Sequence, residues 1–267
     1  MAAGVDGAGN GMKYETMEQG RGTPLLMLHG MMGEPANWWP IGAHLPECCR
    51  MIALRLPFFE DGRRLTDVPA VTDYAQGYAD QAGLERFAVC GNSLGGHVGL
   101  DLALRMPQRV CGLVLSGSSG LFERTFGTVV TRPPRSWVEE KIQEIFYDDR
   151  HVTDEMVDRV IEVISNRRNV RTLIQIAKSA KRDNVAERLR GITCPTLLIW
   201  GRQDEITPPG VAQEFDRNLA DSELHWLDAC GHAPMLEHPK EFAEALGSWW
   251  RRKVQPSGSQ ETDGVAR

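Results

Sequence analysis

The stretch Phe87–Val98, FAVCGNSLGGHV, passes directly from an apolar run into a glycine-rich turn and then back into an apolar pattern. Residues 91–95, GNSLG, form a G-x-S-x-G motif with a predicted strand before it and a predicted helix after it. So tight a turn holds Ser93 in a strained backbone conformation, and side chains at positions 91 or 95 would collide with neighbouring backbone. The motif therefore predicts a serine hydroxyl that stands clear at the carboxyl edge of a sheet.

The rest of the chain alternates short apolar runs with helical patterns. Strands are predicted at 25–29, 51–56, 86–90, 110–116, 196–200 and 223–228. These runs are nearly continuous rather than alternating, which is typical of parallel strands covered on both faces. After the serine, Val98, Leu102 and Met106 share one helical face, and Pro107 ends that helix. The pattern predicts an α/β fold with a mostly parallel sheet.

Composition excludes several classes of function. A chain of 267 residues can bury one large core with an inserted subdomain, and its net charge of -6 gives no reason to expect nucleic acid or an anionic membrane as a partner. No apolar run approaches the roughly 18 residues of a membrane-spanning helix, and no secretory signal is evident. The six cysteines form no CxxC pair, which argues against a zinc site. We expect a cytoplasmic protein without stable membrane association.

The strand pattern disappears over residues 120–190, where three consecutive amphipathic helices are predicted, one of them with Thr153 as its N-cap. This segment is predicted to be a helical cap over a site, with simple helical decoration as the alternative. Residues 12–119 and 191–254 then form the core. The polar, glycine-rich ends, 1–11 and 255–267, are predicted to be disordered.

A serine hydroxyl needs a base and a carboxylate to become a nucleophile. Among the seven histidines, His232 follows the last predicted strand in a loop that leaves the sheet edge, LDACGHAPMLEHP. Asp204 emerges at the same edge in LLIWGRQDEITPP, where Glu205 is its nearest rival and Asp228 lies close to the histidine. The chain order Ser93, Asp204, His232 is the one expected for a strand–serine–helix architecture of this kind.

Four segments, LLMLHGMMG, GNSLGG, GRQDEITP and GHAPMLEHP, occur in order along the chain. With them the sequence resembles an α/β-hydrolase-fold protein over about residues 13–253. The resemblance implies a mostly parallel eight-stranded sheet flanked by helices, with a helical cap inserted between strands six and seven. It also implies an oxyanion hole formed by the N–H groups of Met31 and Leu94, with His29 as a structural member of that loop rather than a base.

This scaffold hosts many activities, so function depends on the site. Serine at position 93, where epoxide hydrolases and haloalkane dehalogenases carry aspartate, argues against both. The elbow GNSLGG is similar to that of the meta-cleavage product hydrolases, which cleave carbon–carbon bonds in vinylogous diketo acids. Two departures from that group favour an ester instead: the loop HGMMGEPANWW has less glycine and serine, and Ala233 stands where an aromatic residue often follows the histidine.

The sequence thus predicts a serine hydrolase acting on small-molecule carboxylic esters through an acyl-enzyme, with no cofactor or metal. Carbon–carbon bond cleavage by the same triad is the alternative enzyme, and a non-catalytic ligand receptor is the alternative of another class. Five residues are predicted to bind substrate, although core packing is an equal alternative for the aromatic ones in the loop after His29: Met32, Trp38, Asn92, Trp137 and Phe146.

Overall fold

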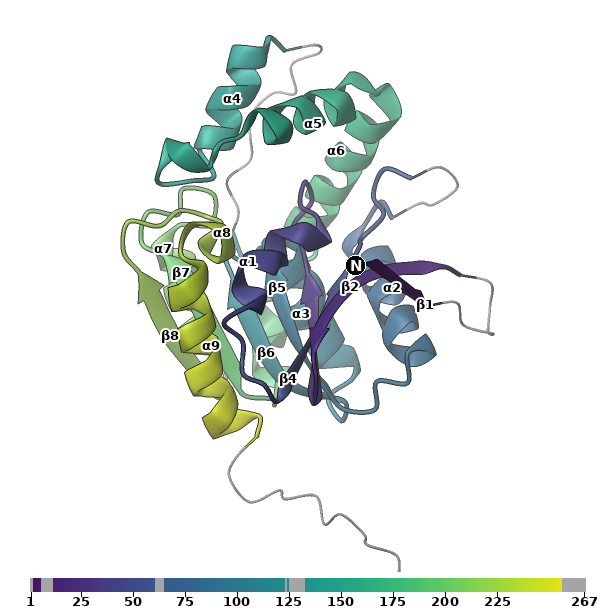
Figure 1. Cartoon of the computed structure of the whole chain (residues 1–267), viewed down its shortest axis with the longest axis vertical. Coiled ribbons are helices and arrows are strands. Elements are labelled where there is room, and N and C mark those ends of the chain that lie inside the picture. The colour runs from purple at the N-terminus through teal and green to yellow at the C-terminus, as the bar shows by residue number, and fades with distance from the viewer. Residues whose placement is uncertain (1, 6–11, 61–64, 123, 125–132, 256–267) are drawn as a thin grey trace, which may run out of the picture.

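The computed structural model describes residues 2–5, 12–60, 65–122, 124 and 133–255 (Figure 1). Within these residues eight strands form one sheet in the order β1-β2-β4-β3-β5-β6-β7-β8. Their bounds are β1 Ala2–Val5, β2 Tyr14–Gly20, β3 Thr23–Leu28, β4 Cys49–Leu54, β5 Phe87–Asn92, β6 Val110–Ser116, β7 Thr196–Gly201 and β8 Ser222–Leu227. Strand β2 pairs antiparallel with β1 and β4, and every other pair is parallel. The predicted α/β class is confirmed.

Helices cover both faces of the sheet. One face carries α2 Val68–Gln81, α3 Leu94–Arg105 and α7 Pro209–Asn218, and the other carries α1 Trp39–Gly42 and α9 Pro239–Lys253, next to the short η1 Pro35–Trp38 and α8 Pro234–Glu237. Along β3, Leu26 and Leu28 belong to the first apolar cluster while Leu25 and Met27 belong to the second. Each such fully buried side chain stabilises the fold by about 1.5–3 kcal/mol, which explains the continuous apolar strands.

The segment between β6 and β7 contains α4 Arg135–Gln143, η2 Asp149–His151, α5 Asp154–Ser165, α6 Arg167–Arg182 and η3 Ala186–Gly191. Helices α4 and α5 lie beyond one end of the sheet, and α6 runs back toward the core (Figure 1). The predicted N-cap is confirmed, because Thr153 Oγ1 accepts a hydrogen bond from Met156 N at 3.2 Å. Ser179 Oγ of α6 accepts one from Val68 N of α2 at 3.1 Å. The inserted helices are therefore joined to the core.

The two chain ends fall mainly outside the described residues. Strand β1, Ala2–Val5, lies inside the N-terminal segment that we expected to be disordered. Of the predicted C-terminal tail, Gln255 alone is described, and its N–H donates to Trp250 O at 3.0 Å. The domain boundaries remain predictions. Among the helices that the structure describes, none is long and apolar enough to cross a bilayer.

Candidate active site

Ser93 sits in the strained turn that the sequence predicts, between β5 and α3. Its backbone has φ 53° and ψ −121°, and among the described residues only one other non-glycine residue, Ala229, has a positive φ. A Cβ at Gly91 would lie 2.3 Å from Gly95 O, and a Cβ at Gly95 would lie 2.1 Å from Leu28 O. No side chain fits at those distances, so both glycines are sterically required and the serine is held in place by its surroundings.

The loop after β3 lies against this turn. A Cβ at Gly30 would come within 3.2 Å of Ser93 Cβ, so Gly30, the residue before Met31, lies against the serine. Leu94 is the first residue of α3, where helical N–H groups have no partner within the helix. The N–H groups of Leu94 and Met31 remain our proposal for the oxyanion hole, since a helix N-terminus stabilises developing negative charge.

His29 is a structural member of that loop. Its ring is buried, Leu56 N donates to its Nε2 at 3.0 Å, and its Nδ1 lies 2.8 Å from Gly30 O. An acceptor at Nε2 requires the Nδ1–H tautomer, which donates to the Gly30 carbonyl. Burial, the largest cause, lowers the pKa of His29 from 6.5 to about 4, so the ring stays neutral and engaged on both nitrogens.

Acid should destabilise the fold through His29. Because its folded pKa of about 4 lies below the ordinary 6.5, the unfolded chain binds more protons between these values. The free energy of unfolding therefore falls as the pH drops from 6.5 toward 4. The loss that protonation of His29 causes over this range is about 3 kcal/mol. Urea unfolding at pH 7 and pH 4.5 should show a larger loss for the wild type than for His29→Gln. Equal losses would mean that other groups cause the acid sensitivity.

His232 and Asp204 form a buried pair. His232 Nδ1 lies 2.9 Å from Asp204 Oδ2, and the two residues are 6% and 2% exposed. Asp204 Oδ1 accepts from Ile206 N and Thr207 N, both at 2.9 Å, and Oδ2 also accepts from Thr207 Oγ1 at 2.8 Å. Such hydrogen bonds hold the carboxylate oriented toward the ring, which leaves the far nitrogen, Nε2, to act as a base.

The rival carboxylates point elsewhere. Glu205, whose side chain is 65% exposed, pairs with Arg124 at 3.0 Å. Asp228, whose side chain is 83% exposed, pairs with Arg202 at 2.6 Å. Both side chains are thus exposed and paired with arginines, and exposed ion pairs of this kind contribute little to stability. The geometry therefore favours Asp204 as the residue that orients His232.

Ser93 and His232 both lie beside the end of β6. Ser93 N donates to Ser116 O at 3.2 Å, and a Cβ at Gly117 would lie 2.8 Å from His232 Nδ1. Asn92 Nδ2 donates to both Ser116 O at 2.9 Å and His232 O at 3.0 Å. Asn92, predicted to bind substrate, is thus engaged in bracing the histidine loop against the serine turn.

The other predicted substrate-binding residues have mixed surroundings. Trp38 is fully buried and packs edge-on against Phe242 of α9 at 6.2 Å, so it belongs to the core instead of a substrate wall. Met32 and Trp137 are half-buried, and Phe146 is buried with its ring stacked on His151 at 5.7 Å. Met32, Trp137 and Phe146 stay candidates for substrate contact.

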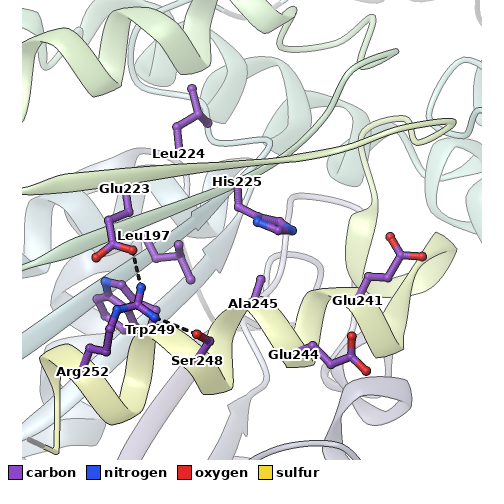
Figure 2. A pocket seen from close by; sticks show the side chains of 10 residues that line it. All are labelled: Leu197, Glu223, Leu224, His225, Glu241, Glu244, Ala245, Ser248, Trp249 and Arg252. Carbon is purple, nitrogen blue, oxygen red and sulfur yellow. Dashed lines mark hydrogen bonds and ion pairs between the residues drawn. The ribbon is translucent and has the colours of Figure 1, made fainter.

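A groove of about 470 Å³ lies elsewhere, between β8 and α9 (Figure 2). None of its lining residues is a predicted site residue, and Arg252 spans it by bonding to Glu223 and Ser248. The groove has a mixed polar and apolar lining at the edge of the sheet, and neither Ser93 nor His232 lines it.

The family model described as "Alpha/beta hydrolase family" matches residues 25–245, a range that contains Ser93, Asp204 and His232. The crystal structure of MGS-MChE2, an alpha/beta hydrolase enzyme from the metagenome of sediments from the lagoon of Mar Chica, Morocco, is 34% identical with a TM-score of 0.75. The similarity covers 92% of this chain and 98% of that one.

Curated relatives of this chain carry two kinds of name. The 2-hydroxymuconate semialdehyde hydrolase of Pseudomonas sp. (strain CF600) is 29% identical over 256 residues, 90% of either chain. Five further relatives, 27–30% identical, are named as hydrolases of hydroxy-oxo dienoates or dienedioates. A pimeloyl-[acyl-carrier protein] methyl ester esterase of Nitrosomonas europaea is 29% identical over 85% of this chain and 95% of its own. Six of these seven relatives are thus named as hydrolases of a hydroxy-oxo acid or a semialdehyde, and one is named as an esterase.

Proposed function

Because this chain belongs to the alpha/beta hydrolase family, we propose that it is a serine hydrolase that cleaves a carbon–carbon bond beside a carbonyl group in a vinylogous diketo acid. Ser93 is the nucleophile, His232 the general base, and Asp204 the residue that fixes the histidine tautomer. The 2.9 Å contact between His232 Nδ1 and the buried Asp204 supports these roles, as does the strained turn at Ser93.

The bond that is cleaved is inferred from the relatives. Six of them carry names of hydroxy-oxo acid or semialdehyde hydrolases, and two of the six align with 90% and 91% of this chain. This agreement over almost the full length is the observation that carries the proposal. It outweighs the two local departures, the loop 29–39 and Ala233, that favoured an ester in the sequence.

The chemistry needs only groups that the site supplies. Ser93 Oγ attacks the carbonyl carbon, His232 takes the hydroxyl proton, and the N–H groups of Leu94 and Met31 stabilise the oxyanion. When the oxyanion collapses, the electron pair of the carbon–carbon bond passes into the conjugated keto acid, which takes up the proton from His232. Water activated by His232 then releases the second acid from the serine.

Ester hydrolysis is the second candidate, and the methyl ester esterase relative favours it. Both reactions begin with the same attack on a carbonyl carbon and differ in the leaving group, an alkoxide or a stabilised carbanion. The named relatives are hydrolases, which disfavours the receptor alternative.

A comparison of two substrates tests the proposal. We expect kcat/KM for 2-hydroxy-6-oxo-6-phenylhexa-2,4-dienoate to exceed that for the p-nitrophenyl esters of acetic to octanoic acid by at least about 100-fold, a difference of about 3 kcal/mol in transition-state binding. Loss of the dienoate absorbance and release of p-nitrophenol report the two reactions, with Ser93→Ala as the blank. Faster turnover of an ester would replace the carbon–carbon assignment by the second candidate.

A further inference from the structure

Glu237, the last residue of α8, is a buried carboxylate between the histidine loop and the cap. It is 7% exposed. Its Oε1 accepts from Gly231 N at 2.8 Å, one residue before His232, and its Oε2 accepts from Tyr147 N at 2.7 Å in the segment after α4. One side chain thus joins two segments that are 84 residues apart in sequence (231 minus 147).

The cap segment also contacts the histidine itself. His232 N donates to Ile145 O at 2.7 Å, while His232 O accepts from Asn92 Nδ2 at 3.0 Å. The fit is close, because a Cβ at Gly231 would lie 2.6 Å from Ile145 O and 2.9 Å from Tyr147 N. The main chain of His232 is therefore held between the cap on one side and β5 on the other.

The buried carboxylate of Glu237 links the histidine loop to the cap segment. Among the ion pairs of the described residues, none includes Glu237, so its carboxylate is stabilised by the N–H groups of Gly231 and Tyr147 and by the Cys230 thiol, whose Sγ lies 3.8 Å from Oε1. A buried carboxylate is unfavourable unless its hydrogen bonds are made, and the bond from Tyr147 N is made only when the 145–147 segment is seated on the loop. The position of the loop and the seating of the cap are thereby linked.

We propose that Glu237 is a positioning residue for His232. By holding the histidine loop against the cap segment 145–147, Glu237 keeps the imidazole in place to accept the proton of Ser93. The inference rests on the proposed function, since it assigns Glu237 a role through the base of the triad. Glu237 does not touch substrate; it acts on the placement of the imidazole, where a shift of about 1 Å changes rates by about 100-fold.

Glu237→Gln tests the clamp, because the glutamine is nearly isosteric but places an NH₂ group against one of the two N–H donors. Glu244→Gln is the matched control: Glu244 lies on α9 in the outer groove, with a side chain that is 63% exposed (Figure 2). Each folded variant is reacted with a fluorophosphonate, which labels an activated serine whatever the natural substrate. The kcat and KM of each variant are also measured, with kcat expressed per site that the fluorophosphonate labels.

We expect the labelling rate and kcat of Glu237→Gln to fall about 10- to 100-fold with KM within about twofold of the wild type, and Glu244→Gln to match the wild type. A purely structural role would lower thermal stability and leave the rate per labelled site unchanged, which would overturn the proposal, as would a rise in KM alone. If Glu237→Gln does not fold, Glu237→Asp, too short to reach both N–H groups, gives the same comparison. A wild type that is not labelled at all would instead refute the proposed function.

Discussion

Replacing Ser93 by alanine should lower kcat/KM by at least about 10⁴-fold, because a triad acts as a unit and its nucleophile has no substitute. The fold should be preserved, since alanine is smaller than serine and the turn depends on Gly91 and Gly95. A Cβ at either glycine would lie within 2.3 Å of a backbone oxygen, and Ser93→Ala leaves both glycines in place. Circular dichroism and thermal unfolding verify the fold, and steady-state kinetics on the preferred substrate measure the loss.

A variant at Ser119 provides the control for this result. Ser119 is buried nearby, and its N–H donates to Ser93 O at 3.1 Å, but it occupies no position in the G-x-S-x-G turn. We expect Ser119→Ala to keep most of the activity. If Ser93→Ala retained more than about a tenth of the wild-type rate, the serine would not be the nucleophile, because loss of a triad member removes orders of magnitude more.

The second large effect is expected at Asp204. Asp204→Asn should lower kcat by about 10⁴-fold, because an amide at this position stabilises the wrong histidine tautomer. Glu205→Gln and Asp228→Asn, which change the same charge on exposed side chains, should stay within about threefold of the wild type. The three variants, measured on one substrate at one pH, separate the orienting carboxylate from its neighbours.

A greater loss in Asp228→Asn than in Asp204→Asn would move the acid to the end of β8. The hydrogen bonds argue against Asp228 as the acid, since Asp204 accepts three hydrogen bonds from Ile206 and Thr207 besides its contact with His232. A carboxylate with so many donors is fixed in place, as catalysis requires.

The sequence predicts the parallel part of the sheet well. The six predicted strands correspond to β3 to β8, with shifts of one to two residues at most ends, because buried parallel strands are continuous apolar runs. Strand β2, YETMEQG, was not predicted, since it pairs antiparallel, is partly exposed and carries polar residues. Strand β1 precedes β2 in the chain, and it forms by pairing with β2 rather than from any apolar pattern.

The candidate triad also follows from local sequence, because each member lies three or four residues after the end of a predicted strand. The prediction of substrate-binding residues is less successful, because Trp38 lies in the core and Asn92 braces the loop of His232. An aromatic residue in a loop is equally suited to packing and to binding, and only the tertiary contact with Phe242 distinguishes them.

Thr207 and Glu237 were not found from the sequence. Thr207 Oγ1 donates to Asp204 Oδ2, and it stands only three residues after that aspartate, so an Asx-type turn could have suggested it. Glu237 has one nearby partner, Gly231, but its other partner, Tyr147, lies 90 residues earlier, between α4 and η2. Contacts between segments far apart in the chain are set by tertiary packing, which a single sequence does not display.

The central claim is that Ser93 is activated by His232, and intact-mass and peptide-mass measurement after fluorophosphonate treatment tests it most directly. The account predicts one adduct per chain, located on Ser93, with no adduct in Ser93→Ala and strongly slowed formation in Asp204→Asn. An adduct on another residue, or wild-type labelling that persists in Ser93→Ala, would contradict it.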